Sequence, residues 1–530
     1  MKINIKNLLC LFFICPGILL SQDILTTEIK VIEGFKPSVP VAKRLNQNAV
    51  FADTIKQDKI QKYNIYDFYL DSDYKVRPLS PVRVKSDRLD KLYGTSISIG
   101  TGFPISSKVD LLYNSKRSKN TAYGLIYNHL NNRIKINEKN AGCSSNAMYV
   151  YGKNIRKHSV LIGSLEYDRK SAYSYGHNIT YIDYESMLNR FTYTKFSLTA
   201  KSINLTKKAL NYQTNIFFSD LNERSENQFH FSSLLTKEIR SLPLKLDISF
   251  DNYSNYNSSQ DILGVEARDV QLVGFVPSID LQKFNIDFNL RLGLNYESES
   301  GFLFLPSFIG EMELVKDILL ISSGIESAKY RNTYKTLSDE NLFIYALGTN
   351  QEILVNDFQQ DLKTTASKEL FFNIRNILGK DEVWNGGIRY GYISNFAFFD
   401  NKNFNSYNRF LVNYTDVWQL NINSSYDRKI RQGIHVQFNA EYLNWGDKNI
   451  AHKPTLFIDA SIPVNLRDKI ILEPEIEYIG GYRSFSTNEY KSNARFYSNL
   501  TFRYIYSNQI SAYLILNKDL PNTIQLRKFE

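Results

Sequence analysis

Polar and apolar side chains alternate along most of this chain from about Thr95 onward. In the clearest segment an apolar row occupies every second position: Phe284, Ile286, Phe288, Leu290, Leu292, Leu294 and Tyr296. The positions between them carry no large apolar side chain. This period of two predicts a β-strand with one apolar face. At roughly 3.3 Å per residue the strand is about 40 Å long, which is enough to cross a bilayer at a tilt.

The same alternation recurs along the rest of the chain, and strand and turn signals together mark about 22 such segments. Further apolar rows lie in 242–250, 418–426, 434–442 and 494–504. Short connections are expected near 239–242, 279–283, 314–317, 377–382, 464–469 and 506–510. Long connections are expected near 252–268, 328–366, 397–408 and 482–490, and the two kinds largely alternate. Short periplasmic turns that alternate with longer extracellular loops are typical of outer-membrane barrels.

The polar faces of these segments support a barrel around an aqueous or protein-filled lumen. An arginine such as Arg291 would cost roughly 2–4 kcal/mol at the midplane of the bilayer, so it is expected to face the lumen instead of lipid. The sequence therefore predicts an all-β fold, a transmembrane antiparallel β-barrel of about 22 strands with a short periplasmic N-terminal extension.

Composition narrows the class of protein further. The 530 residues include 36 Tyr, 34 Phe and 3 Trp, 22% of residues are charged, and the formal net charge is +10. So many aromatic residues argue against disorder, and they suit the aromatic girdles at the two membrane interfaces. Beyond the first 21 residues the sequence has no apolar run near 18 residues, which excludes a helical membrane protein. The positive charge is spread along the chain, so nucleic acid is not predicted as a partner, whereas outer-membrane lipid is.

The N-terminus predicts export. Lys2 and Lys6 precede an apolar core from Leu8 to Leu20, and Ser21 offers a small residue for cleavage before Gln22. We therefore expect a signal peptide over 1–21, a periplasmic N-terminal extension over 22–93, and the barrel over 94–530. The expected location is the cell outer membrane.

Two stretches resemble a group of Bacteroidota outer-membrane proteins, the TonB-dependent receptor-like barrels that lack a plug domain. The first, residues 27–40, is a β-prone stretch that runs into Lys36-Pro37 and a second proline, Pro40. The second is similar to the family's strand pair and following loop: Leu305-Pro306-Ser307 through Leu320, Arg331-Asn332-Thr333-Tyr334-Lys335 and Glu340-Asn341-Leu342-Phe343. The resemblance implies uptake of a ligand across the outer membrane, with loops 328–366 and 252–268 outside and carrying selectivity.

The chain departs from a typical TonB-dependent receptor at both ends. Only about 70 residues precede the first strand, whereas a typical plug has more than a hundred, so another element must close the lumen. The chain also ends in Phe529-Glu530 after a short segment, Thr523 to Leu526, so we expect an abbreviated closing strand.

The N-terminal extension holds the first candidate site. Glu28, Ile29, Lys30, Val31 and Ile32 form a short strand-prone segment that could act as a TonB box, adding to the sheet edge of an inner-membrane energy-transducing (TonB-type) protein. Five residues of this kind also occur by chance in most proteins. Other envelope proteins are the alternative partners.

The second candidate site is an acidic row on one strand. Glu473, Glu475 and Glu477 project to one side, while Leu472, Ile476 and Tyr478 lie on the other. Three carboxylates facing the lumen could attract a cation or a basic ligand. Pairing with Lys or Arg on neighbouring strands is the alternative.

Nothing in the sequence predicts a cofactor, a metal site or catalysis. The six histidines lack ligand spacing, and neither a phosphate-binding loop nor a dinucleotide fingerprint is present. Uptake or transport is the leading hypothesis. A structural or scaffolding barrel of an envelope assembly or secretion complex, and a passive pore, are the alternatives.

Overall fold

The computed structural model describes residues 92–103, 105–136, 139–173, 188–203, 209–222, 226–240, 242–255, 269–344, 362–400, 410–446, 450–484 and 491–518. All of them belong to one compact unit, Arg88–Glu530. The expected signal peptide and nearly all of the expected N-terminal extension lie outside the described residues, so their boundaries stay predictions.

Most of the described chain forms a single antiparallel sheet of 22 strands. Its first strands are β1 (Thr95–Gly102), β2 (Ser106–Asn114), β3 (Thr121–Asn132), β6 (Cys143–Ile155), β7 (Ser159–Tyr173), β8 (Leu188–Ser202), β9 (Asn211–Leu221), β10 (Glu226–Ile239), β11 (Leu242–Asn255) and β12 (Val270–Lys283). The remaining strands are β13 (Ile286–Glu297), β14 (Gly301–Val315), β15 (Leu319–Arg331), β16 (Thr364–Gly379), β17 (Glu382–Asp400), β18 (Leu411–Arg431), β19 (Ile434–Trp445), β20 (Leu456–Ser461), β21 (Val464–Leu466), β22 (Ile470–Ile479), β23 (Arg495–Ile505) and β24 (Ser511–Lys518).

Two small elements lie outside this sheet. The two-residue strands β4 (Lys135–Ile136) and β5 (Lys139–Asn140) pair with each other, and helix α2 (Tyr334–Glu340) follows β15. Among the described residues no helix is long and apolar enough to span a membrane.

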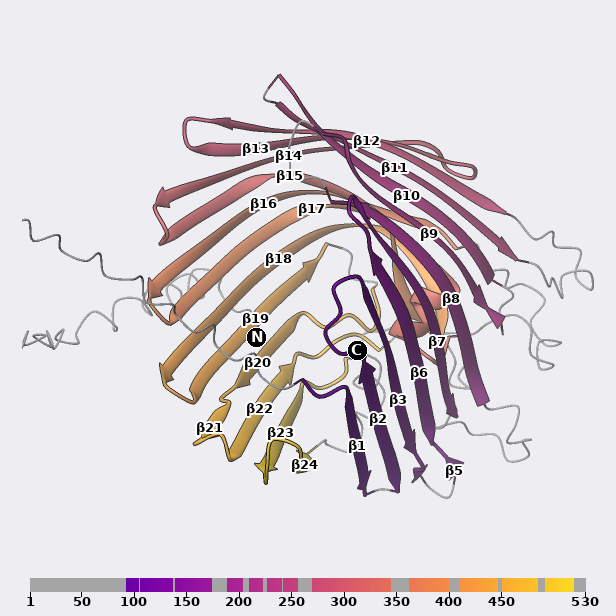
Figure 1. Cartoon of the computed structure of the whole chain (residues 1–530). Helices are drawn as coiled ribbons and strands as arrows, with labels where there is room; N and C mark the ends of the chain where they lie inside the picture. Colours follow the sequence, from indigo (N-terminus) through magenta and orange to yellow (C-terminus); the bar gives the residue numbers. More distant parts are fainter. Residues whose placement is uncertain are drawn as a thin grey trace, which may run out of the picture. The chain divides into compact units, whose positions relative to one another are not determined.

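Each strand pairs with its neighbour in the sequence, and the sheet curls into a barrel (Figure 1). Strands β20 and β21 both pair with β19 and with β22, so they lie end to end between these two neighbours. Going around the barrel, the 22 strands of the sheet therefore count as 21 staves, with β20 and β21 sharing one. The prediction of an all-β barrel of about 22 strands is confirmed. Most short connections lie at one end of the barrel and the longest ones at the other, as the sequence predicts, but the three-residue links between β1 and β2 and between β13 and β14 lie at the end of the long connections.

The two edge strands of the sheet, β1 and β24, run in the same direction, because 21 is an odd number of strands that alternate in direction. Within the described residues β1 pairs only with β2 and β24 only with β23. A side-chain hydrogen bond between Ser98 Oγ and Tyr513 Oη, 3.2 Å long, links the two edges. The expected abbreviated segment Thr523–Leu526 lies outside the described residues, so that expectation stays open.

The period-two pattern separates the two faces of the wall. On β13, Leu292 and Tyr296 are each 52% exposed on the outer face, whereas Asn295 and Glu297 on the other face are buried. The apolar row therefore faces outward to lipid, and the polar row faces inward. Aromatic side chains pair on the outside, as Tyr390 and Trp418 do with ring centroids 5.3 Å apart.

One turn differs from the prediction. The sequence pattern starts a strand at Phe284 and expects the short connection at 279–283, but β12 continues to Lys283 and the turn consists of Phe284 and Asn285. Both residues adopt left-handed backbone, with φ of 55° and 58°, as a tight hairpin turn requires. Phenylalanine seldom adopts this conformation, and the apolar alternation runs on through the turn, so the pattern alone gave no sign of the boundary.

Candidate functional site

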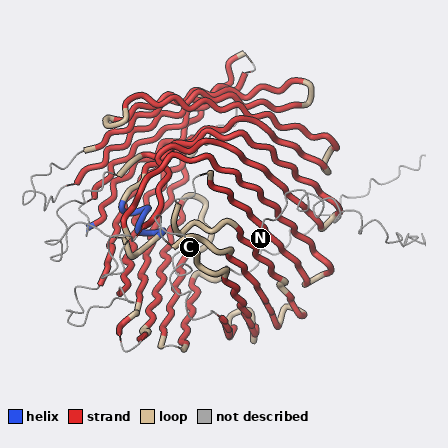
Figure 2. Tube along the Cα trace, turned by 180° about the vertical axis from the view of Figure 1, so that it is seen from behind, coloured by secondary structure: helices blue, strands red, loops and turns tan. Residues whose placement is uncertain are grey.

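A segment of the connection between β15 and β16 folds back inside the ring of strands (Figure 2). We call residues 332–344 the inward loop. Its helix α2 begins with a capping box, in which Thr336 N–H donates to Thr333 Oγ1 and Thr333 N–H donates to Thr336 Oγ1 at 2.9 Å. The sequence analysis expects this connection to start near 328 and to face the outside of the cell, and it does not foresee a contact with the lumen. Instead β15 extends to Arg331, and the inward loop packs against inward-facing side chains of distant strands.

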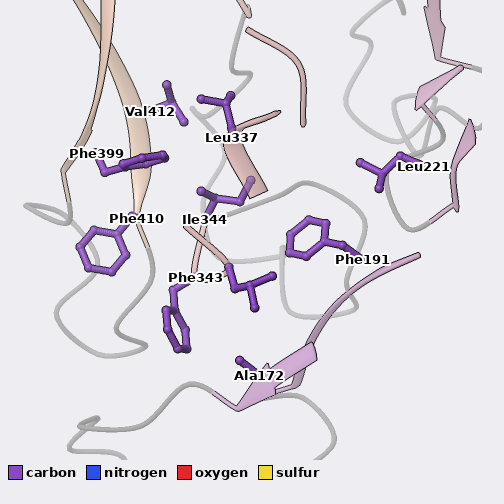
Figure 3. Close-up of a cluster of buried hydrophobic side chains, with 10 residues drawn as sticks. Ala172, Phe191, Leu221, Leu337, Phe343, Ile344, Phe399, Phe410 and Val412 are labelled. Atoms are coloured by element: carbon purple, nitrogen blue, oxygen red, sulfur yellow. The ribbon is translucent and has the colours of Figure 1, made fainter. Parts of the chain in front are cut away.

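An apolar cluster holds the inward loop (Figure 3). Leu337, Leu342, Phe343 and Ile344 supply its loop side, and Leu342 and Ile344 are fully buried. The wall side comes from two regions that lie apart in the sheet: Ala172, Phe191 and Leu221 on β7 to β9, and Phe399, Phe410 and Val412 on and beside β17 and β18. Burying each such side chain contributes roughly 1.5–3 kcal/mol, so the cluster fixes the loop between the two regions of the wall.

Paired charges add a second set of contacts. Lys335 Nζ of α2 lies 2.9 Å from Asp168 Oδ2 of β7 and 2.9 Å from Asp339 Oδ1 of its own helix. Lys170 of β7 completes a ring of four charges, 2.6 Å from Asp339 Oδ1 and 3.4 Å from Asp168 Oδ2. Burial alone would lower the pKa of Lys335, but the two carboxylates outweigh it and raise that pKa. The ring favours one orientation of α2, because the contacts of Lys335 with Asp168 and of Lys170 with Asp339 form only when α2 lies against β7.

Side chains of the barrel wall also form hydrogen bonds with backbone groups of the inward loop. The buried carboxylate of Glu226 on β10 accepts hydrogen bonds from the N–H groups of Tyr334 and Lys335, which lie in the first turn of α2, where N–H groups have no acceptor within the helix. Asn189 Nδ2 on β8 donates to the carbonyl of Leu342 at 2.9 Å. Residues more than a hundred positions away thus position the loop backbone, which spans the lumen from the β15–β16 side to β8 and β10.

A third group of contacts secures the base of the inward loop. Arg331 Nη1 lies 2.8 Å from Glu297 Oε1, and Thr364 Oγ1 donates to the same oxygen at 2.7 Å. Glu297 is only 3% exposed, so these contacts tie the ends of β13, β15 and β16 together. At the other end of α2, Lys453 from the connection before β20 pairs with Glu340.

The acidic row is present on β22, with its three carboxylates on the inward face. Glu475 Oε2 accepts a hydrogen bond from Asn499 Nδ2 at 2.8 Å, and Glu477 lies opposite Asp459 of β20 in the register. A fourth acidic residue thus lies beside the row. Its role in attracting cations stays a prediction.

The other sequence-based candidates are not tested by the structure. The TonB-box segment Glu28–Ile32 lies outside the described residues, and so do 256–268 of the second expected ligand loop. Within the described chain, no group of three or more His, Cys, Asp or Glu side chains is placed to hold a metal ion. The inward loop was missed because it lies in a long connection. Its traces in the sequence are the capping threonines, the Lys335–Asp339 spacing and the apolar run Leu342-Phe343-Ile344.

Several solved barrels share this architecture. The ferric enterobactin receptor PfeA of Pseudomonas aeruginosa aligns with a TM-score of 0.60 at 10% identity, over 80% of this chain and 74% of that chain. The FrpB iron transporter of Neisseria meningitidis aligns with a TM-score of 0.60 at 9% identity, over 81% of this chain and 77% of that chain. The fold is that of a TonB-dependent receptor barrel.

The siderophore receptor PirA of Acinetobacter baumannii is similar in the same way, with a TM-score of 0.57 at 12% identity over 78% of this chain and 73% of that chain. These three proteins are named as receptors or, for FrpB, as a transporter. No family model and no curated protein sequence matches the chain. At identities near 10% the likeness to a TonB-dependent receptor barrel concerns the fold.

Proposed function

We propose that this chain is an outer-membrane uptake receptor of the plug-less, Bacteroidota type of TonB-dependent receptor barrel, which moves an external ligand inward. The observation that carries the proposal is the inward loop, held across the lumen by an apolar cluster and a ring of charges. A passive pore needs an open lumen, whereas a receptor needs an obstruction that ligand binding or energy input can move. The architecture shared with siderophore receptors supports the same assignment.

Three partners follow from this proposal. The barrel wall contacts outer-membrane lipid, and the loops at the long-connection end meet the ligand outside the cell. Residues 22–93 would lie in the periplasm, where Glu28–Ile32 would pair with an inner-membrane TonB-type protein. A pull-down of the 22–93 segment with the C-terminal domain of such a protein tests that contact, and the absence of binding would exclude it.

Single-channel conductance in planar bilayers tests whether the lumen is gated. Three mature chains are compared: the intact protein, a chain without residues 22–93, and a chain in which 333–361 is replaced by a short Gly-Ser linker. We expect the intact protein to be closed and the loop replacement to conduct, because the linker lacks the apolar and charged anchors. Steady conductance of the intact protein would instead identify a passive pore. If none of the three chains conducts, a scaffolding role is favoured.

Uptake measurements test the energy requirement. Iron-labelled enterobactin, the ligand named for PfeA, is the first probe, and its accumulation is compared with and without a collapsed inner-membrane proton gradient. Accumulation that stops on collapse supports energised uptake. If conductance shows a gated barrel and this probe is not accumulated, the receptor takes a different ligand class.

A further inference from the structure

An apolar groove of about 640 Å³ lies in the wall formed by β3, β6, β7, β8 and β9. Its floor is a pair of glycines, Gly152 on β6 and Gly163 on β7, which face each other in the register. Tyr123 on β3 and Leu198 on β8 occupy the same row and form its sides. A Cβ atom at Gly152 would meet no heavy atom within 4 Å, and one at Gly163 would meet only Leu198 at 3.5 Å. The groove exists because two adjacent side chains are missing.

The groove opens on the lipid face of the barrel. The neighbouring row on the same face is fully apolar, and it consists of Leu125, Val150, Leu165, Phe196 and Phe218. The opposite face carries polar side chains such as Ser197, whose Oγ donates to Asn215 Oδ1 at 3.2 Å. The groove therefore faces the hydrocarbon of the membrane, and its volume falls in the range of about 300–1,000 Å³ of ordinary ligand sites.

Positive charge gathers at the end of the barrel where the groove lies. The groove begins at Thr121, the first residue of β3, and the adjacent short connections are 115–120 and 156–158. Together these two connections hold five exposed cations and no acidic residue: Lys116, Arg117, Lys119, Arg156 and Lys157.

Short connections between strands that do not line the groove lack this charge. Lys316 is followed by Asp317, Lys380 is followed by Asp381, and Asp468 lies between Arg467 and Lys469. The turns 284–285 and 432–433 carry no charged residue. Each of these connections therefore has at most one excess positive charge. Beside the groove, connection 115–120 has three and connection 156–158 has two. The positive charge is therefore concentrated at the groove and is not shared by this whole end of the barrel.

We propose that this groove binds an anionic phospholipid of the inner leaflet of the outer membrane. An acyl chain fills the groove over Gly152 and Gly163, and the phosphate of the headgroup meets the cations of the two turns. Clusters of Lys and Arg beside a membrane-spanning segment bind anionic headgroups in this way. The proposal rests on the outer-membrane placement of the barrel, which puts its short turns at the periplasmic surface.

Native mass spectrometry of the mature protein in mild detergent, with phosphatidylglycerol or phosphatidylcholine added, tests the site. Gly152→Leu places a side chain in the groove at a position where a Cβ atom meets no heavy atom within 4 Å. The double variant Arg156→Ser/Lys157→Ser removes headgroup contacts. We expect the parent to retain phosphatidylglycerol but not phosphatidylcholine, and each variant to reduce that retention at least about tenfold.

Two matched controls separate the site from general effects. Gly310→Leu adds the same side chain to another glycine in register with the lipid-facing Phe288, where a Cβ atom has only ordinary contacts, and Arg467→Ser/Lys469→Ser removes two charges from a distant turn. Both are expected to retain phosphatidylglycerol as the parent does. Equal retention of the two lipids, or unchanged retention in Gly152→Leu, would overturn the proposal. If Gly152→Leu lost a co-purifying protein and kept its phosphatidylglycerol, the groove would be a site for a protein partner and the lipid proposal would be wrong.

The readout also separates this proposal from the proposed function, because lipid retention does not depend on transport. The uptake and conductance measurements could contradict the proposed function while Gly152→Leu and Arg156→Ser/Lys157→Ser still lose phosphatidylglycerol. In that case the lipid site is supported without the transport function. Labelling of Lys119→Cys, made in a chain whose free Cys143 is replaced by serine, reports the orientation in intact cells. Modification by a reagent confined to the cell exterior would contradict the periplasmic position of these turns and overturn the inner-leaflet assignment.

Discussion

At the scale of single residues, the inward loop depends on two charge contacts that form only in the docked arrangement, Lys335 with Asp168 and Lys170 with Asp339. Asp168 and Lys170 lie on one strand of the wall, and Lys335 and Asp339 lie one turn apart on α2. Each is partly or largely removed from water, so an unpaired member would be costly. The ring therefore selects one position of the loop more than it adds net stability to the barrel.

Replacing Lys335 tests this ring. We expect Lys335→Met to weaken docking of the inward loop by about 2 kcal/mol, because two charged hydrogen bonds are lost while Lys170 still neutralises part of the acidic charge. The measurement is brief opening events in single-channel records of the mature chain. Lys316→Met, which removes the same charge from an exposed turn, serves as the control. Identical records for Lys335→Met and the parent would contradict a gating role of the ring.

His452 predicts a pH response at the long-connection end. It is largely buried between Phe410 and Tyr482, and burial lowers its pKa from 6.5 to about 4, with Asp400 opposing the shift and Arg495 and Lys453 adding to it. A group whose pKa is lowered on folding stabilises the packed state above its ordinary pKa and loses that contribution as the pH falls. The affected window is therefore about pH 6.5 to 4, and the full effect is about 3 kcal/mol.

Hydrogen exchange across this window tests the response. Amides around His452 are expected to exchange faster as the pH falls from 6.5 toward 4, after correction for the intrinsic rate. His452→Phe keeps the aromatic packing without a titrating group, so its profile should be flat. A parent profile as flat as that of the variant would show that His452 does not couple to the local packing.

At the scale of elements, each strand obeys one local rule: an apolar side chain faces lipid and a polar one faces inward. Leu292 and Asn289 show both faces on β13, where Asn289 Nδ2 donates to Asp280 Oδ1 at 2.6 Å. Short hairpin turns add left-handed residues such as Asp317, Arg467 and Asp468. The strands could be predicted because both signals, the alternation of apolar and polar residues and the turn residues, are local in sequence. Phe284 was placed in a strand because the alternation continues through the turn there.

A pair of arginine substitutions on β13 tests the face assignment. Leu292→Arg is expected to destabilise the membrane-inserted barrel by about 2–4 kcal/mol, because the cation would lie in hydrocarbon. Asn289→Arg is expected to be close to neutral, because it faces inward beside Asp280. Urea unfolding in lipid vesicles measures both, and equal destabilisation would mean that the two residues share a face.

The acidic row on β22 gives another prediction at this scale. The triple variant Glu473→Gln, Glu475→Gln, Glu477→Gln, made in the chain whose inward loop is replaced, should lose part of its preference for cations over anions. Reversal potentials in a salt gradient measure that preference. An unchanged reversal potential would remove any role for the row in ion selectivity.

At the scale of the whole molecule, the central fact is a barrel whose lumen is crossed by one of its own connections. Barrels of this size are ordinarily plugged. The inward loop obstructs part of the lumen, because it contacts β7 to β10 on one side and β17 and β18 on the other. Its replacement by a linker is therefore the most informative single change for conductance.

The sequence by itself determined the fold class, the approximate number of strands, most of the alternation of short and long connections in the second half of the chain, and the apolar face of its clearest strands. These features follow from side chains within a few positions of one another, because a strand alternates with a period of two and a turn needs only a few residues.

Only the tertiary structure decided that residues 332–344 turn inward, that Glu226 receives the first turn of α2, and that Gly152 and Gly163 meet to form a groove. The physical reason is sequence separation. Lys335 and Asp168 are 167 residues apart, and no local period records such a contact. Their meeting depends on closing the sheet into a ring, which brings distant strands to face each other across the lumen.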